Sequence, residues 1–507
     1  MALIRVGFDV IVLGGGPAGC VVASRLSEDP RRSVCLIEAG PDYGPYAAGR
    51  WPADLVYANE LATSHDWGIP GGWSSWRAKV VGGCSAHNGC FIAWGSRADF
   101  DEWEDAGNPG WSADALERYR RRGQEMLRVR PSRVDDLEPF MRVGLDAAAE
   151  IGLPVLEDFD DPRATEGAAP ILVNAVEDVR WNVAFAYLDP ARDRPNLTIM
   201  PDVLVDRLHL DGERATGAIV RVGDDELEVF ADLVVVAAGS YGSPAILLRS
   251  GVGAAEELTE LSIEVQADIP GVGRNLADHP RVEVAYRPTP ELLSQMRDHV
   301  ARRPAKAQTL IKARSDACPP DTWDLHVMMR VRESFSTDPR LASGKPLAHL
   351  FVHAMKPASR GSVRIASPDP TALPIVNHGF LSDEAGRDAA TLASGIPLAR
   401  RIAMAGAMNG LLEDEIAPGP DADDDELSAY MRTTVGGYWH PGGTCKMGPA
   451  SDAEAVVDAS GRLHGFANVY VADASIMPTI PRANTHLPVI AIAEKIAEGV
   501  AGALSSE

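Results

Sequence analysis

His440 is the residue whose type and surroundings best suit it to move a proton in a reaction. It stands in Tyr438-Trp439-His440-Pro441-Gly442-Gly443-Thr444, a turn rich in small residues in which a core role is hard to motivate. Imidazole titrates near neutral pH, so it can serve as a general base under physiological conditions. We expect His440 to be catalytic, and a structural, hydrogen-bonding histidine is the alternative.

A glycine-rich turn near the amino end has the spacing of a phosphate-binding site. Gly14, Gly16 and Gly19, with Pro17 and Ala18 between them, follow a β-branched apolar run and open a helical pattern. The first glycine of such a motif permits the tight turn, the second admits a pyrophosphate, and the third lets helix and strand pack closely. The amino end of the helix then stabilises the phosphate charge.

An acidic residue follows at the distance expected for a nucleotide ribose. Glu38 lies 19 residues after Gly19, at the end of a strand-like run, and Ala39 follows it. A carboxylate there accepts the adenosine hydroxyls and disfavours a 2′-phosphate, so NADP is not expected. No second such motif follows a strand, and no redox C-x4-C pair is present, which favours FAD reduced directly by a substrate over NAD. An unrelated glycine turn is the alternative reading.

The elements that must position these residues follow from the hydrophobic pattern. A βαβ unit is expected around the glycine turn, with strands 9–13 and 33–37 and a helix over 21–26. Later strand-like runs return to it, at 197–200, 204–210, 227–231 and 233–237. The stretch 41–107, rich in Gly, Trp and Pro, is expected to be irregular and to wrap a ligand.

The rest of the pattern predicts a separate sheet-based domain. Helical stretches are expected from Ser112 onward and over 143–152. Beyond residue 282, strand-like pieces alternate with helical ones as far as residue 435. The strands are expected at 324–331, 347–355 and 361–365, and the helices at 383–407 and 425–433.

Composition excludes several classes of protein. The 507 residues include 45 % hydrophobic and 24 % charged side chains, which is ordinary for a folded soluble protein. The formal charge of −24 argues against nucleic acid as a partner. We expect no leader peptide, no membrane span and no metal site, and the six dispersed cysteines favour reduced thiols in the cytoplasm.

Motifs along nearly the whole chain resemble those of the glucose-methanol-choline (GMC) oxidoreductases. The two signature regions are Gly82-Gly83-Cys84-Ser85-Ala86-His87-Asn88 and Gly239-Ser240-Tyr241-Gly242-Ser243-Pro244. Further matches are Pro270-Gly271-Val272-Gly273-Arg274-Asn275-Leu276 with Asp278-His279, the segment around Tyr438-Trp439-His440, and Val471-Ala472-Asp473-Ala474-Ser475.

The resemblance implies an α/β fold, with a Rossmann-like FAD-binding domain plus an α+β substrate domain that has a mostly antiparallel sheet. We expect the FAD-binding domain to comprise 1–131, 176–285 and 436–507, and the substrate-binding domain to comprise 132–175 and 286–435. The segment 128–140 lacks the His-Gly and Gly-Pro element usual in relatives.

The resemblance also assigns FAD contacts to this sequence. Val205 corresponds to a backbone contact to adenine, Asp473 and Ala474 to the segment near the ribityl and pyrophosphate part, and Asn88 to the loop beside the flavin ring. The other expected contacts are Val81, Gly82, Gly83, Gly89, Ala238, Gly239, Asn484 and Thr485.

His87 is expected to carry the flavin covalently. In the choline oxidase branch of the family, a histidine at this place is bonded to the 8α-methyl group, whereas other branches have an apolar residue. A stacked, non-covalent His87 is the alternative.

For catalysis, the resemblance implies that His440 takes the hydroxyl proton of an alcohol while a hydride passes to flavin N5. The family's partner position falls on Asn484, whose amide can donate and accept and so orient the alcohol oxygen. A turn-capping role is the alternative for Asn484, and His486 is expected either to support the site from behind or to be structural.

The expected substrate is a primary alcohol with an aryl or aliphatic body, which is oxidised to the aldehyde with O2 reduced to H2O2. Met328, Tyr438 and Trp439 are the candidate pocket residues, although plain packing is an alternative for the aromatic pair. Choline would need a carboxylate and aromatic faces, and no matching glutamate is found. A dehydrogenase with another acceptor and a hydroxynitrile lyase remain alternatives, and the protein is expected to be a monomer or homodimer.

Overall fold

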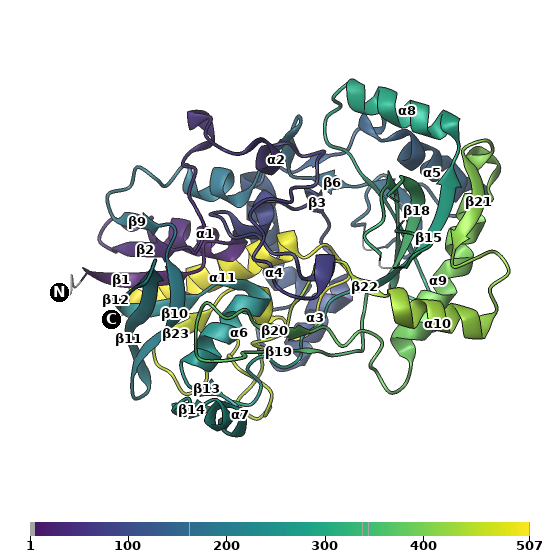
Figure 1. The fold of residues 1–507 in the computed structure, drawn as a ribbon. Coiled ribbons are helices and arrows are strands. Elements are labelled where there is room, and N and C mark those ends of the chain that lie inside the picture. The colour runs from purple at the N-terminus through teal and green to yellow at the C-terminus, as the bar shows by residue number, and fades with distance from the viewer. Residues whose placement is uncertain (1–5, 162, 337, 343, 506–507) are drawn as a thin grey trace.

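Two large sheets lie at opposite ends of the molecule (Figure 1). The computed structural model describes residues 6–161, 163–336, 338–342 and 344–505. One sheet carries the glycine-rich turn and the other adjoins the turn that carries His440, so the elements between the two sheets determine the candidate site.

The first sheet has a parallel core and an antiparallel edge. Its strands run in the order β10-β11-β12-β1-β2-β9, and β23 pairs with β12. The pairs β12/β1, β1/β2, β2/β9 and β12/β23 are parallel, whereas β10, β11 and β12 form an antiparallel meander. The bounds are β1 Val6–Leu13, β2 Val34–Ile37, β9 Leu197–Met200, β10 Leu204–Asp211, β11 Arg214–Val222, β12 Asp225–Val236 and β23 Val469–Val471.

Helix α1 (Pro17–Leu26) connects β1 and β2 and lies close to the sheet. A Cβ atom on Gly19 would lie 1.8 Å from the carbonyl oxygen of Gly14, so only glycine permits this approach. Pro17 occupies the first turn, where its missing N–H leaves no bond unmade. The long carboxy-terminal helix α11 (His486–Leu504) packs against α1 and against α4 (Ala113–Met126).

The second sheet is antiparallel and runs in the order β21-β15-β18-β17-β16-β5, with β22 paired to β15. One face packs against helices α5 (Pro139–Glu150) and α9 (Arg387–Ala403) and contributes Val282, Val327 and Val352 to an apolar core. The bounds are β5 Gly167–Pro170, β15 Pro280–Pro288, β16 Thr309–Ala313, β17 Leu325–Arg332, β18 Leu347–Ala354, β21 Leu412–Ala417 and β22 Gly436–Gly437.

Smaller elements complete the chain. The further helices are α2 Ala53–Val56, α3 Arg97–Asp105, α4 Ala113–Met126, α6 Gly239–Arg249, α7 Ala255–Glu260, α8 Pro290–Ala301 and α10 Asp424–Thr434. The further strands are β3 Phe91–Ile92, β4 Arg130–Pro131, β6 Leu172–Val173, β7 Ala175–Val176, β8 Val179–Arg180, β13 Val252–Gly253, β14 Ala267–Asp268, β19 Ser362–Arg364 and β20 Ile375–Asn377.

The structure confirms the expected fold class, with a Rossmann-like α/β part and an α+β part built on an antiparallel sheet. Two local predictions were wrong, and some strands were not predicted. The runs 227–231 and 233–237 form one strand, β12, because it continues unbroken across Asp232. The strand β11 was not predicted. Helix α3 interrupts the stretch expected to be irregular, and a capping box between Ser96 and Asp99 fixes its start.

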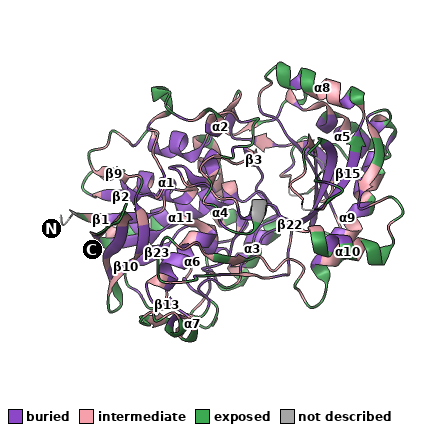
Figure 2. Cartoon of the chain, in the orientation of Figure 1, coloured by how far each residue is buried: buried purple, intermediate pink, exposed green. Residues whose placement is uncertain are grey.

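The predicted division of the chain into two domains stays a prediction. Its boundary at 285 falls inside β15, which pairs with β18 of the antiparallel sheet from Arg281 onward. The central strands of both sheets, such as β2 and β18, are buried, whereas exposed residues gather on outer helices such as α8 and α10 (Figure 2). Across the residues that the structure describes, no helix is both long and apolar enough to cross a bilayer.

Candidate active site

A single cavity of about 770 Å³ runs from the glycine-rich turn to the antiparallel sheet. Its size is within the range of small-molecule and cofactor sites. It brings together most of the residues proposed from the sequence: Gly14, Gly16, Pro17, Ala18, Glu38, Ala39, Gly83, His87, Asn88, Gly89, Val205, Ala238, Gly239, Met328, Tyr438, Trp439, His440, Asp473, Ala474, Asn484, Thr485 and His486.

Three proposed cofactor residues do not line the cavity. Gly19 is buried beneath Gly14, and the side chain of Val81 is fully buried in the core. Gly82 donates its backbone N–H to the carbonyl oxygen of Gly15 at 2.8 Å. These residues therefore support the shape of the phosphate turn from behind.

Glu38 faces the cavity and also holds the glycine-rich turn in place through hydrogen bonds. Its Oε2 accepts a hydrogen bond from the backbone N–H of Gly15 at 2.7 Å, and its Oε1 accepts one from that of Gly40 at 2.9 Å. Burial raises the pKa of this carboxyl to about 7. Each carboxylate oxygen keeps a second lone pair, so ribose hydroxyls can still bind there.

The open space around the turn fits a dinucleotide. A Cβ atom on Gly16 would meet nothing within 4 Å, so its backbone faces the cavity without cover. Beside the turn, Oδ2 of Asp473 accepts hydrogen bonds from the N–H of Gly239 at 2.8 Å and from the hydroxyl of Ser243 at 2.6 Å. Asp473 thereby ties β23 to the amino end of α6, a second helix end directed at the cavity.

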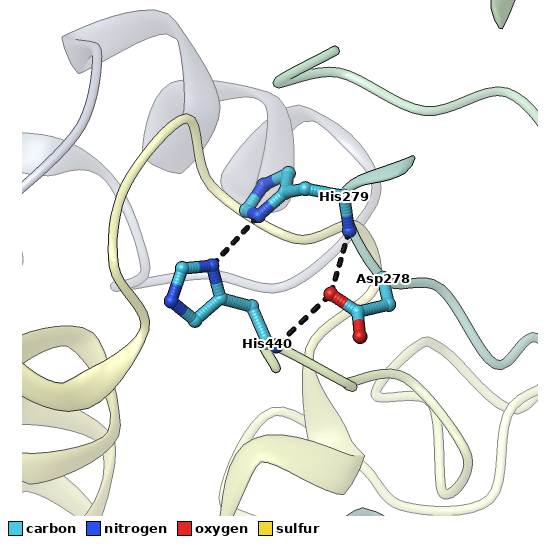
Figure 3. A group of neighbouring side chains, drawn as sticks. All are labelled: Asp278, His279 and His440. Carbon is cyan, nitrogen blue, oxygen red and sulfur yellow. Dashed lines mark hydrogen bonds between the residues drawn. The ribbon is translucent and has the colours of Figure 1, made fainter. Parts of the chain in front are cut away.

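The imidazole of His440 is held by a short chain of hydrogen bonds (Figure 3). Its Nδ1 lies 3.0 Å from Nδ1 of His279, and Nε2 of His279 lies 3.1 Å from the carbonyl oxygen of Pro481. A carbonyl only accepts, so Nε2 of His279 carries a proton and its Nδ1 accepts from His440. The neutral His440 ring is therefore protonated on Nδ1 and keeps a lone pair on Nε2.

The side-chain amide of Asn484 lies next to that lone pair. Its Nδ2 lies 3.2 Å from Nε2 of His440, which makes the amide a donor to the basic nitrogen. The amide oxygen Oδ1 is buried and has no hydrogen-bond partner among the described residues, so it is available to accept from a ligand hydroxyl. His440 and Asn484 thus present an acceptor nitrogen and an acceptor oxygen to the same part of the cavity.

Asp278 holds the backbone of both histidines of the pair in place. Its Oδ1 accepts from the N–H of His279 at 2.8 Å and from the N–H of His440 at 2.9 Å (Figure 3). Burial raises its pKa to about 6. One carboxylate therefore joins the start of β15 to the turn after β22.

Burial and positive neighbours keep the histidines neutral. The pKa of His440 lies well below its usual value because the ring is desolvated and because His279, His353 and Arg77 disfavour a second positive charge. Burial likewise lowers the pKa of His279 to about 3. His440 is accordingly unprotonated on Nε2 at neutral pH.

The turn that carries His440 has an unusual backbone. Trp439 has a φ of 64°, a left-handed conformation that bulky residues rarely adopt. The ring of Tyr438 stacks on His353 at 3.8 Å between centroids and lies 4.4 Å from that of His440. The left-handed residue lets three consecutive side chains, at 438, 439 and 440, line the cavity together.

His87 and His486 also line the cavity. Burial, together with Arg77 and Arg180, lowers the pKa of His87 to about 3, so its ring is neutral and has a free lone pair. His486 begins α11, and its buried Nε2 has no hydrogen-bond partner within the described part of the chain.

Sequence reasoning missed four side chains that shape the site. It quoted His279 only as part of a motif and gave it no role, and it overlooked Arg281, Arg330 and Arg332, which line the cavity. A signal for two of them was present, since Met328, Arg330 and Arg332 alternate along β17 and so share one face of the strand.

Comparisons with known proteins agree with this architecture. Models of the family described as GMC oxidoreductase match residues 8–281 and 357–493. The chain is 34 % identical to 5-(hydroxymethyl)furfural oxidase of Methylovorus sp. over 97 % of this chain and 98 % of that protein. It is 32 % identical to oxygen-dependent choline dehydrogenase of Brucella anthropi over 97 % of this chain and 95 % of that protein.

A solved structure shows the same likeness. Pyridoxine 4-oxidase from Mesorbium loti superposes with a TM-score of 0.82 at 28 % identity, over 97 % of this chain and 99 % of that one. The family models, the relatives and this structure all agree with the motifs in the sequence. The chain therefore belongs to the GMC oxidoreductase family and is a flavoenzyme of this alcohol-oxidising group.

Proposed function

We propose that this enzyme oxidises primary alcohols to aldehydes with FAD and reduces O2 to H2O2. The observation that carries the proposal is the Nε2 lone pair of His440, which lies beside Asn484 in the same cavity as the glycine-rich turn. Relatives named as an oxidase of 5-(hydroxymethyl)furfural and as a choline dehydrogenase that uses oxygen support this reaction class.

In the mechanism, His440 accepts the hydroxyl proton at Nε2 while an N–H of the Asn484 amide, whose Nδ2 lies 3.2 Å from that nitrogen, donates to the alcohol oxygen and orients it. The imidazolium that forms keeps its Nδ1–H bonded to Nδ1 of His279, which in turn is held by the carbonyl of Pro481. The contact at Nδ1 therefore stays in place as the charge develops, while the substrate hydroxyl takes the place of the Asn484 N–H at Nε2. Bound FAD would supply the acceptor for the hydride that leaves the alcohol carbon.

The cofactor would be held by the chain's own polar groups. The backbone around Gly16 and the amino end of α6 face the phosphates in this proposal, and Glu38 accepts from the adenosine ribose. The backbone near Val205 contacts adenine, and the segment at Asp473 and Ala474 lies near the ribityl part. Asn88 and Thr485 belong to the ring end of the same cavity.

We further propose that His87 binds the flavin covalently through its 8α-methyl carbon. Two observations support this. The imidazole lines the cavity next to Asn88, and its ring is neutral because its pKa is lowered to about 3. A stacked, non-covalent role for His87 is the competing proposal, and denaturation in acid separates the two.

The electron acceptor is tested by reoxidation. After anaerobic reduction with an alcohol, the flavin should regain its absorbance on mixing with oxygen at least as fast as with a quinone or a dye, and peroxide should form in equal amount to aldehyde. Slow reoxidation by oxygen and fast reoxidation by the dye would identify a dehydrogenase. Cyanohydrin cleavage without flavin bleaching would identify a hydroxynitrile lyase.

The organisation of the molecule completes the proposal. The FAD-binding part is assigned to 1–131, 176–285 and 436–507, and the substrate-binding part to 132–175 and 286–435. The protein is placed in the cytoplasm as a monomer or homodimer, which cell fractionation and light scattering would test.

A further inference from the structure

The face of the antiparallel sheet that borders the cavity carries positive charge. Register pairs Met328 with Phe351 and Arg330 with His349 between β17 and β18, and it pairs Arg281 with His353 between β15 and β18. Residues paired across a sheet point to the same side, so these side chains share one face. The other face is the apolar core described above.

Three arginines on this face line the same cavity as His440, and among the described residues of this sheet no carboxylate lines it beside them. The carboxylates of the cavity wall, Glu38, Asp66 and Asp473, belong to other parts of the chain. Glu283 stands on the same face but is not part of the cavity wall. Its Oε1 lies 3.3 Å from Nη2 of Arg281, and its Oε2 accepts from the hydroxyl of Ser334 at 2.9 Å. The chain as a whole has a formal net charge of −24, so this positively charged region has the opposite sign to the rest of the protein.

The three guanidinium groups differ in the negatively charged partners that balance their positive charge. Arg281 pairs with Glu283, and Arg330 forms an ion pair with Glu138 at 2.9 Å. Arg332 has no carboxylate within 4.0 Å among the described residues, and its buried Nε and Nη2 have no hydrogen-bond partner. Two aromatic rings offset part of its positive charge. Cζ of Arg332 lies 3.9 Å from the ring centroid of Phe335 and 5.7 Å from that of Phe351.

An uncompensated guanidinium beside two others is costly for the protein alone. Burial and the positive charges of Arg281 and Arg330 lower the pKa of Arg332 to about 9, so the group is still charged at neutral pH. A well-packed apolar side chain would fill the same space more stably. A ligand anion would satisfy the two open donors and remove the repulsion.

We propose that the alcohol substrate carries a carboxylate, which Arg332 binds with the support of Arg281 and Arg330 while the hydroxyl faces His440. The inference rests on the proposed function and narrows its substrate class to hydroxymethyl compounds with an acidic group on a ring or chain. A guanidinium binds a carboxylate through two parallel hydrogen bonds. Tyr438, Trp439 and Met328 line the same cavity and bury the apolar body of the substrate.

The same charges oppose a quaternary ammonium. Choline would place its cation in a cavity that three arginines line and to which this sheet face contributes no carboxylate. This chain and the choline-oxidising relatives therefore share a family and differ in the charge that their substrates carry.

The test uses the FAD-loaded enzyme and two ring alcohols that differ in one group, 4-(hydroxymethyl)benzoate and 4-(hydroxymethyl)benzamide. We expect kcat/KM for the benzoate to exceed that for the amide, and we expect this ratio to fall about 10- to 100-fold in Arg332→Gln. Electronic effects of the ring substituent are the same in both enzymes and cancel in that comparison. Arg287→Gln removes an equal charge from a side chain that is 55 % exposed, and it should leave the ratio unchanged.

A second readout does not depend on turnover. Benzoate has no hydroxyl to oxidise, and its binding perturbs the flavin spectrum, so its Kd should be lower than that of benzamide and should rise in Arg332→Gln. If Arg332→Gln does not fold, the comparison of benzoate with benzamide on the wild-type enzyme decides.

The outcomes separate the two proposals. An equal or lower kcat/KM for the benzoate than for the amide, with no preference for benzoate in the titration, overturns the inference while alcohol oxidation stands. If neither alcohol reduces the flavin but benzoate still binds through Arg332, the proposed reaction fails and the anion site remains.

Discussion

The Nδ1 atoms of His440 and His279 face each other at 3.0 Å, and only one of them can carry the proton between them (Figure 3). Because the carbonyl of Pro481 takes the other N–H of His279, that proton belongs to His440. The contact joins positions that are 161 residues apart in the chain. It fixes which nitrogen of His440 is basic before any substrate arrives.

Replacing His440 by Ala should lower the rate constant for flavin reduction by an alcohol about 10²- to 10⁴-fold, the usual effect of removing a positioned general base. FAD content should be unchanged, because none of the proposed phosphate or adenosine contacts is lost. Stopped-flow absorbance measures the rate. The matched control is His209→Ala, since His209 contacts Phe230 on the first sheet, away from the cavity. Asn484→Ala should lose less than His440→Ala, and the opposite order would move the base elsewhere.

His279 is predicted to be a positioning residue. His279→Leu removes the acceptor for Nδ1–H of His440, so the proton can move to Nε2 and the rate of reduction should fall about tenfold or more. His279→Gln retains an acceptor oxygen and should restore most of the rate. Equal rates for the two variants would assign His279 to packing alone.

The low pKa of His440 has a consequence for the pH dependence of the wild type. A base acts in its unprotonated form, and here burial, His279, His353 and Arg77 hold its pKa well below 6.5. Lowering the pKa extends the active range toward acid. The rate of reduction should therefore be constant above pH 6.5 and should decline only below it, which stopped-flow measurements across about pH 5 to 8 would check. A titration centred above 6.5 would contradict the charge environment described here.

Glu38 is predicted to be needed for cofactor retention. Glu38→Ala removes the acceptor of the Gly15 N–H and the expected acceptor of the ribose hydroxyls, and hydrogen bonds to a charged group are each worth about 1.5 to 3 kcal/mol. Less FAD should co-purify with the variant, and the free cofactor should bind more weakly by calorimetry. In a covalently flavinylated enzyme the same loss would appear as incomplete flavin incorporation. Full occupancy in Glu38→Ala would remove Glu38 from the cofactor site.

Covalent attachment through His87 has a direct readout. Acid-precipitated wild-type protein should retain the flavin and fluoresce in a denaturing gel, whereas His87→Asn should release it into the supernatant. Free FAD in the wild-type supernatant would favour the stacked, non-covalent histidine and would leave the family assignment unchanged.

The parts of the site that the sequence predicted are those that depend on short segments. Gly14, Gly16 and Glu38 lie within one βαβ unit, so their spacing alone predicts their meeting at a cavity. The turn at His440 has its own local composition. By contrast, the contact between His279 and His440 depends on how β15 meets the turn after β22, and no local pattern contains that information.

The arginine face was missed for a different reason. The alternation of Met328, Arg330 and Arg332 was present in the sequence, but a charged residue on a strand usually faces solvent, and only Met328 of the three was predicted to line the pocket. Only the packing of the sheet against the cavity shows that the polar face is the inner one. Strand β21, with sequence Leu-Glu-Asp-Glu-Ile-Ala, was missed because it is an edge strand rich in acidic residues.

The most direct test of the account is anaerobic mixing of the FAD-loaded enzyme with a primary alcohol such as 4-(hydroxymethyl)benzoate, followed by admission of oxygen. We expect an alcohol to bleach the flavin absorbance of the wild type and to leave that of His440→Ala nearly unchanged on the same timescale. Oxygen should then restore the absorbance of the wild type, with one peroxide formed per aldehyde. If none of a panel of primary alcohols of either charge bleaches the wild-type flavin, or if His440→Ala bleaches as fast as the wild type, the central claim is wrong.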